Sequence, residues 1–251
     1  MAKRKHRMSR RKKRMLVWTL VLLLAALLPV GLRFLRTALA ENREPGVLLS
    51  SGLSADSLPP YGGEVSVSLQ EENTGLSPTA LPPEPFILLS ELDALGRTGP
   101  ALAVIGPESL PTAPRGEIGD VRPAGFQNVR YDDLIEDHYL YNRCHLIAYQ
   151  LSGINADPRI LFTGTRYLNV EGMLPWENAV ASFVRRVGCH VLYRVTPLYM
   201  SGELLPRYVE LEAVSMEDGG RGLRFHVLVY NVQPGIVINY RDGSSRRDDS
   251  S

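Results

Sequence analysis

The chain has 251 residues with 44% hydrophobic composition and a formal net charge of +1. This length and apolar content allow one sizeable globular domain with extensions. Two cysteines, Cys144 and Cys189, permit at most one internal disulfide and exclude a cysteine-rich metal site.

The charge is distributed unevenly along the chain. Residues 1–14 hold nine Lys and Arg and no acid, and every lysine of the protein lies there. Residues 84–242 hold 14 arginines against 19 acids, a net charge of −5. We therefore expect the basic segment and the acidic body to serve different purposes.

Residues 15–32 form an apolar run of eighteen residues without a charge. This length is close to the lower limit for a membrane-spanning helix and is long for the core of a signal peptide. Because basic flanks stay in the cytosol, residues 1–14 are predicted to be cytoplasmic and the remainder to be exported. A buried core helix, or a nucleic-acid-binding arm for the basic run, explains this combination less well.

Two outcomes of the targeting remain open. Ala38 and Ala40 have the spacing of a small-x-small cleavage site, and cleavage after Ala40 would give a secreted protein. Arg33 and Arg36 lie between that site and the apolar run, which favours an uncleaved membrane anchor. In both cases the body of the protein is expected to work outside the cytoplasmic membrane.

The rest of the chain divides into three parts. Residues 33–83 are rich in Gly, Ser, Pro and acids without a helical or strand period, which predicts a flexible linker. Residues 243–251 are predicted to be a disordered tail. One folded domain is expected at 84–242.

The predicted elements of this domain begin with a short apolar segment in 85–97. Residues 106–126 are broken by Pro and Gly and should be irregular. Residues 140–151 favour a strand that turns into another element, and 159–169 favour a strand. A helix is predicted from Pro175 to Gly188, because Pro suits the first turn, the acid Glu177 favours the positive end and Gly ends a helix.

Three further strands are predicted at 190–200, 208–216 and 224–232. The last two segments alternate apolar and polar residues, as half-buried antiparallel strands do. The order of the elements predicts an α+β domain with a mainly antiparallel sheet and one long helix.

The residues that carry chemistry are Arg143 and His145, followed by Asn169 and Glu177. Their pattern resembles the DNA/RNA non-specific endonuclease family, whose ββα-metal (His-Me finger) site is built around an Asp-Arg-Gly-His motif. In that family a metal-binding Asn follows the His by roughly two to three dozen residues, and a Glu lies eight residues further on the same helix. Asn169 and Glu177 have this eight-residue spacing. The resemblance extends over 84–242 and is strongest to exported bacterial members, such as DNA-entry nucleases and secreted streptococcal DNases.

The resemblance implies a metal-dependent nuclease that cuts DNA, and also RNA, without sequence specificity and leaves 5′-phosphate ends. His145 is the expected general base, because an imidazole that titrates near neutrality can accept a proton from water. Asn169 is the expected ligand of Mg²⁺ or Mn²⁺, since hard cations prefer oxygen ligands and need few from the protein. Arg143 would clamp the scissile phosphate, and Glu177 would orient water on the metal.

Two positions depart from the family motif. Asn142 stands in place of the frequent Asp and Cys144 in place of Gly, but neither position is the base or the ligand, so activity should survive. Cys144 could be simply buried or could form a disulfide with Cys189. Arg166 and Arg194 are candidates for substrate contact, with surface solvation as an equal alternative.

Other functions are weighed against this one. A non-catalytic surface protein that assists DNA capture predicts a damaged His/Asn/Glu set, and the set is intact. A secreted toxin or virulence nuclease would use the same chemistry on another target, and for a structural exported domain the spacing would be coincidence. The acidic body is unusual for nucleic-acid binding, but a groove can supply local positive charge from Arg143, Arg166, Arg185 and Arg194.

Overall fold

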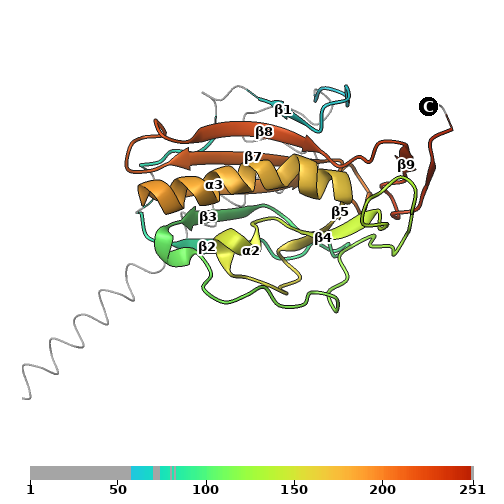
Figure 1. Ribbon diagram of the computed structural model, residues 1–251, viewed down its shortest axis with the longest axis horizontal. Coiled ribbons are helices and arrows are strands. Elements are labelled where there is room, and N and C mark those ends of the chain that lie inside the picture. The colour runs from blue at the N-terminus through green and yellow to red at the C-terminus, as the bar shows by residue number, and fades with distance from the viewer. Residues whose placement is uncertain (1–57, 70–73, 80, 82, 250–251) are drawn as a thin grey trace, which may run out of the picture. The chain divides into compact units, whose positions relative to one another are not determined.

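The computed structural model describes residues 58–69, 74–79, 81 and 83–249 (Figure 1). The basic segment 1–14 and the apolar run 15–32 lie outside the described residues, as does the Ala38–Ala40 region. In the part that is described, no helix is both long and apolar enough to cross a membrane.

A six-stranded antiparallel sheet forms the centre of the fold, with strand order β1-β8-β7-β6-β3-β2. The strands are Ser66–Ser68 (β1), Phe86–Leu89 (β2), Ala101–Ile105 (β3), Val191–Leu198 (β6), Tyr208–Ser215 (β7) and Arg224–Tyr230 (β8). β6, β7 and β8 confirm the three strands expected near the end of the domain. The predicted α+β class with a mainly antiparallel sheet is also confirmed.

β3 lies inside this sheet, between β2 and β6, and the sequence analysis did not identify it. Its sequence, ALAVI, is apolar throughout, because the strand is covered on both faces: Ala103 and Ile105 pack into the main core and Val104 into a smaller cluster. A short, continuously apolar run has no alternation that would mark it as a strand.

The folded part extends beyond 84–242 on both sides. β1 pairs with β8, with Ser66 opposite Val229, inside the segment expected to be a flexible linker. β10 (Ser245–Arg247) pairs with β9 (Ile236–Ile238), inside the segment expected to be a disordered tail. Both added strands have only three residues, so backbone pairing rather than a hydrophobic period holds them in place.

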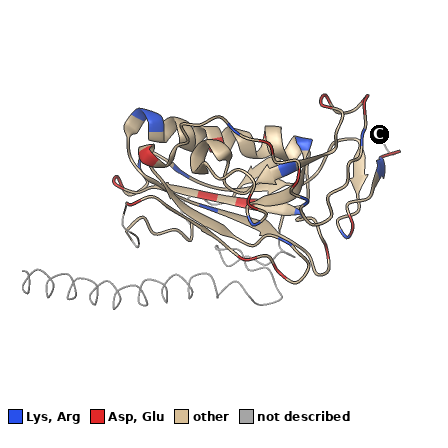
Figure 2. Cartoon of the chain, turned by 90° about the horizontal axis from the view of Figure 1, so that it is seen from below, with Lys and Arg blue, Asp and Glu red and all other residues tan. Residues whose placement is uncertain are grey.

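One face of the large sheet is covered by helix α3 (Leu174–Val187), as Figures 1 and 2 show. The indole of Trp176 packs on the Phe225 ring with 5.0 Å between ring centroids. The main core lies between the helix and the sheet. Four buried helix residues contribute to it: Val180, Ala181, Phe183 and Val184.

A separate two-stranded sheet, β4 with β5, and the helix α3 form the ββα unit. β4 (Tyr141–His145) and β5 (Leu161–Thr165) pair as an antiparallel hairpin, with the one-turn helix α2 (Tyr149–Ser152) in their connection. After β5 the chain is helical at 166–167, continues as a π-helical segment η4 (Leu168–Met173) and then becomes α3. Figure 1 shows the hairpin next to one end of α3.

The helix begins earlier than expected. Met173 is itself helical, with φ −83° and ψ −44°, so Pro175 does not lie at a free helix N-terminus. In a regular α-helix the proline ring would clash with the carbonyl four residues before it. The wider π-helical turn directly before Pro175 relieves this clash. Gly188 ends the helix as expected, with φ 76°.

Candidate active site

A cleft of about 710 Å³ lies beside the β4–β5 hairpin, η4 and the beginning of α3. Five of the six residues that the sequence singled out line this cleft: Arg143, His145, Arg166, Asn169 and Glu177. The hairpin and the helix therefore bring together positions that lie far apart in the sequence.

His145 ends β4 and is buried, with 7% of its surface exposed. Its Nε2 lies 2.9 Å from the carbonyl oxygen of Asn155. Because a carbonyl only accepts, Nε2 carries the hydrogen and donates it, which leaves Nδ1 as the basic nitrogen. Burial, together with the charge of Arg115, lowers the pKa of His145 to about 4. The ring is therefore a neutral base at physiological pH.

Asn169 and Glu177 lie eight residues apart on one helical stretch. In a regular α-helix that spacing leaves an angular offset of about 80° around the axis. The hydrogen bond from the Leu174 N–H to the Asn169 carbonyl spans five residues and widens the turn between them. Both side chains line the same cleft.

The oxygens of Asn169 and Glu177 are not used elsewhere: neither side chain makes a hydrogen bond to another described residue. Glu177 is 7% exposed, and burial raises the pKa of its carboxyl to about 8 in spite of the nearby Arg115. A buried carboxylate without a partner is unfavourable on its own. An amide oxygen and a carboxylate in one cleft are the donor types that hard divalent cations prefer.

Arg143 has a second role that the sequence did not reveal. Its Nε donates to the Val121 carbonyl at 2.6 Å and its Nη2 to the Gly119 carbonyl at 2.9 Å. The guanidinium carbon lies 4.3 Å from the centroid of the Phe126 ring. Arg143 thus holds the loop that forms one wall of the cleft, and among the described residues nothing accepts a hydrogen bond from its Nη1.

The expected place of Arg194 in the substrate site is wrong. Its neighbours in β6, Tyr193 and Val195, point into the main core beneath α3, so alternation directs Arg194 to the opposite face of the sheet. There its Nε donates to Oε2 of the fully buried Glu212 at 2.6 Å. Arg185, exposed in the last turn of α3, does not line the cleft either.

Arg115 is the main site residue that the sequence analysis missed. It lies in the irregular segment 106–126, where no periodicity distinguishes a functional residue from a solvated one. Its Nη2 lies 3.4 Å from His145 Nδ1. The hydroxyl of Tyr149 donates to the carbonyls of Ala113 and Pro114, at 3.0 and 3.2 Å, and so holds this loop against α2.

The two departures from the family motif are accommodated. Asn142 lines the cleft. Cys144 and Cys189 are free thiols, so they form no disulfide, and burial raises the pKa of the Cys144 thiol above its usual range. A Cβ built on Gly164 would lie 2.5 Å from the Cys144 sulfur. The missing side chain at Gly164 therefore provides the room that Cys144 needs.

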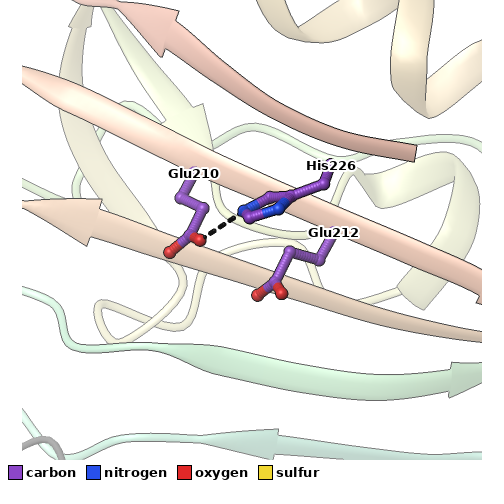
Figure 3. A group of neighbouring side chains, drawn as sticks. All are labelled: Glu210, Glu212 and His226. Carbon is purple, nitrogen blue, oxygen red and sulfur yellow. Dashed lines mark hydrogen bonds and ion pairs between the residues drawn. The ribbon is translucent and has the colours of Figure 1, made fainter. Parts of the chain in front are cut away.

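A second group of potential ligands, Glu210, Glu212 and His226, is buried on the face of the sheet that α3 does not cover (Figure 3). His226 Nε2 and Glu210 Oε1 lie 2.7 Å apart. Both carboxylate oxygens of Glu212 already accept a hydrogen bond, one from Arg194 and the other from the Gly75 N–H at 3.0 Å. A cation would have to displace Arg194, so this group acts as a structural network that fastens residue 75 to the sheet.

A β-hairpin whose first strand ends in a buried histidine, followed by a helix that carries an asparagine into the same cleft, defines a ββα-metal nuclease. The chain belongs to the DNA/RNA non-specific endonuclease family, whose model matches residues 88–217, slightly more than half of the chain. It is therefore an endonuclease, as the resemblance implied. Comparison with curated proteins gave no match.

Several solved nucleases share this fold. NucA from Streptococcus agalactiae with no metal bound superposes with a TM-score of 0.66 and 25% identity, covering 77% of this chain and 92% of that chain. The same protein with magnesium bound gives 0.62 and 24%, covering 70% and 84%. Sda1 nuclease with a bound zinc ion gives 0.56 and 28%, covering 65% and 82%.

Proposed function

We propose that this endonuclease hydrolyses DNA and RNA without sequence specificity, using His145 as general base and Asn169 as ligand of Mg²⁺ or Mn²⁺. The observation that carries the proposal is the convergence of three groups in one cleft: a neutral His145, the unpaired amide of Asn169 and the buried carboxyl of Glu177.

His145 would accept a proton from the attacking water at Nδ1. The Asn155 carbonyl holds the other nitrogen, so the ring has the correct tautomer and a fixed orientation before substrate binds. The water oxygen then bonds to phosphorus as the bond to the 3′-oxygen breaks, which leaves a 5′-phosphate. Arg115, beside His145, would pair with a phosphate oxygen and offset the charge that develops there.

The donor set fits a hard divalent cation. Asn169 would hold the ion through its amide oxygen, and Glu177 would keep Asn169 and the ion's hydration shell in place by hydrogen bonding. Such an ion, when bound, stabilises negative charge on the phosphate and on the leaving oxygen. Arg143, whose Nη1 is not engaged by the described residues, would contact the phosphate while it holds the wall of the cleft.

We also propose that the enzyme works outside the cytoplasmic membrane. The proposal is supported by the nine basic residues that precede the uncharged run 15–32. An uncleaved run would anchor the domain at the cell surface, whereas cleavage after Ala40 would release it.

The direct test is digestion of plasmid DNA and of RNA by the purified protein, in Mg²⁺, in Mn²⁺ and in EDTA. We expect both substrates to be degraded only with the metals, and end labelling to detect 5′-phosphates. Equal activity in EDTA would contradict the metal, and 3′-phosphate ends would contradict the proposed bond cleavage. Tight binding of DNA without turnover would support a capture protein instead.

A further inference from the structure

Tyr139 is an exposed aromatic side chain that lines the catalytic cleft, with 39% of its surface accessible. The guanidinium carbon of Arg130 lies 5.2 Å from the centroid of the Tyr139 ring, and a β-bridge holds the two residues opposite each other. Arg130 in turn forms an ion pair with Asp132, with 2.8 Å between Nη2 and Oδ1. The ring is thus supported by its neighbours while a large part of its surface faces solvent.

Arg166 lies beside Tyr139. The Arg166 N–H donates to the carbonyl of Leu140, the residue after Tyr139, at 2.8 Å, and both side chains line the cleft. The guanidinium of Arg166 pairs with Asp137, with 2.6 Å between Nη2 and Oδ2. The two side chains are 30% and 53% exposed, and ion pairs that accessible contribute little to stability. A phosphate can therefore replace Asp137 at small cost.

We propose that Tyr139 and Arg166 form a subsite for one unstacked nucleotide of the substrate, with the base on the Tyr139 ring and a phosphate on Arg166 in place of Asp137. This subsite rests on the nuclease function proposed above and specifies which form of nucleic acid the cleft prefers. Every base has a π-face, so stacking on an aromatic ring needs no particular sequence. It does need a base that has left the duplex stack, so single-stranded substrate is favoured.

The stacking half of the subsite is tested by Tyr139→Ala. We expect the KM for a single-stranded oligonucleotide to rise about five- to tenfold with kcat unchanged. The KM for a perfect duplex should change less, and Tyr139→Phe should behave like the wild type. Tyr61→Ala is the matched control, because Tyr61 is also 39% exposed but does not line the cleft.

The phosphate half is tested by Asp137→Asn and Arg166→Gln. We expect Asp137→Asn to lower KM severalfold, because Arg166 is freed. Arg166→Gln should raise KM and reduce the slope of log(kcat/KM) against log salt by about 0.7 for single strands. Asp133→Asn is the control for Asp137→Asn, since it removes the same charge from the same loop but lies outside the cleft, paired with Arg247.

Binding measured without turnover separates this proposal from the proposed chemistry. Fluorescence anisotropy with a labelled single-stranded oligonucleotide in EDTA should give a five- to tenfold weaker Kd for Tyr139→Ala even if the metal or base assignment fails. The subsite is overturned if Tyr139→Ala binds as tightly as Tyr61→Ala, or if it affects duplex and single strand equally. It is also overturned if Asp137→Asn and Asp133→Asn have the same KM.

Discussion

His145 Nδ1 lies 3.4 Å from Nη2 of Arg115, although the two residues are 30 positions apart in the sequence. Burial and the positive charge at that position lower the pKa of His145, and the same charge would face a phosphate bound as proposed. If His145 is the proposed base, one side chain would affect both its protonation state and the charge that develops during the reaction.

Arg115→Gln should reduce turnover by about 10²–10³, because one preorganised charge at the phosphate is lost. It should also move the acid limb of the kcat/KM profile to higher pH. The reason is that Arg115 helps to hold the pKa of His145 near 4, and a base works only when unprotonated. Profiles at constant ionic strength check this. Arg122→Gln, an exposed arginine of the same loop outside the cleft, is the control. An unmoved acid limb would contradict the coupling.

His145→Ala and Asn169→Ala should fail in different ways. Without His145 the proton acceptor is missing, so DNA should still bind while turnover falls by about 10²–10⁴ and added imidazole restores part of the rate. Without Asn169 the Mn²⁺ concentration needed for half-maximal rate should rise, and imidazole should not help. Asn178→Ala is the control: the amide oxygen of Asn178 already accepts a hydrogen bond from Gln150, so this variant should leave the metal requirement unchanged.

Near-normal turnover in well-folded His145→Ala would contradict the assignment of the base. Circular dichroism of each variant shows whether the fold is retained, since a residue needed only for packing would lower activity by unfolding the domain.

Arg194→Ala should destabilise the protein without changing KM. The variant leaves the fully buried Glu212 carboxylate without its charged partner, which costs about 3–5 kcal/mol in the free energy of unfolding. Urea denaturation measures this loss. Arg166→Gln should show the opposite pattern, a changed KM with near-normal stability, because its partner Asp137 is exposed. A raised KM in folded Arg194→Ala would contradict a purely structural role and would show that Arg194 contributes to substrate binding.

His190 joins the ends of three strands and should make stability depend on pH. Its ring lies 2.9 Å from Glu108, in the short 3-10 helix Pro107–Ser109 (η3) after β3, and 2.5 Å from Glu217 after β7. Burial disfavours the charged ring, but hydrogen bonds to both carboxylates outweigh it, so the pKa of His190 is raised. The same bonds lower the pKa of Glu108 and, against burial, that of Glu217.

These bonds should contribute fully to the free energy of unfolding when the pH is below the unfolded pKa of histidine, about 6.5, and above that of glutamate, about 4.3. It should disappear as pH rises through the raised pKa of His190, and again as pH falls through the lowered pKa values of the two acids. The difference in Tm between the wild type and His190→Gln should therefore be largest between about pH 4.5 and 6.5. A difference that does not vary with pH would refute the charged interaction.

Protease added to intact cells should remove the nuclease domain and spare residues 1–14. The expected orientation follows from the basic residues that precede the apolar run 15–32. Tags at the two ends, followed by immunoblotting with and without permeabilisation, distinguish the ends. A domain that is degraded only after permeabilisation would show that the orientation is reversed.

The sequence by itself determined the elements that repeat a local pattern. Alternation marked β7 and β8, and Gly188 marked the end of α3. The spacing of His145, Asn169 and Glu177 marked three residues that line one cleft. Such features are visible because each depends on residues a few positions apart, or on a motif whose members keep their separation along the chain.

Tertiary structure alone decided the rest, because those features depend on contacts between distant positions. β1 and β10 are held by pairing with other strands, and β3 is apolar because both its faces are covered. Which arginine reaches the site depends on where a loop folds back and on which face of a strand a residue lies. An irregular loop brings Arg115, for which the sequence predicted no role, to His145. Strand alternation directs Arg194, expected in the substrate site, to the opposite face of the sheet.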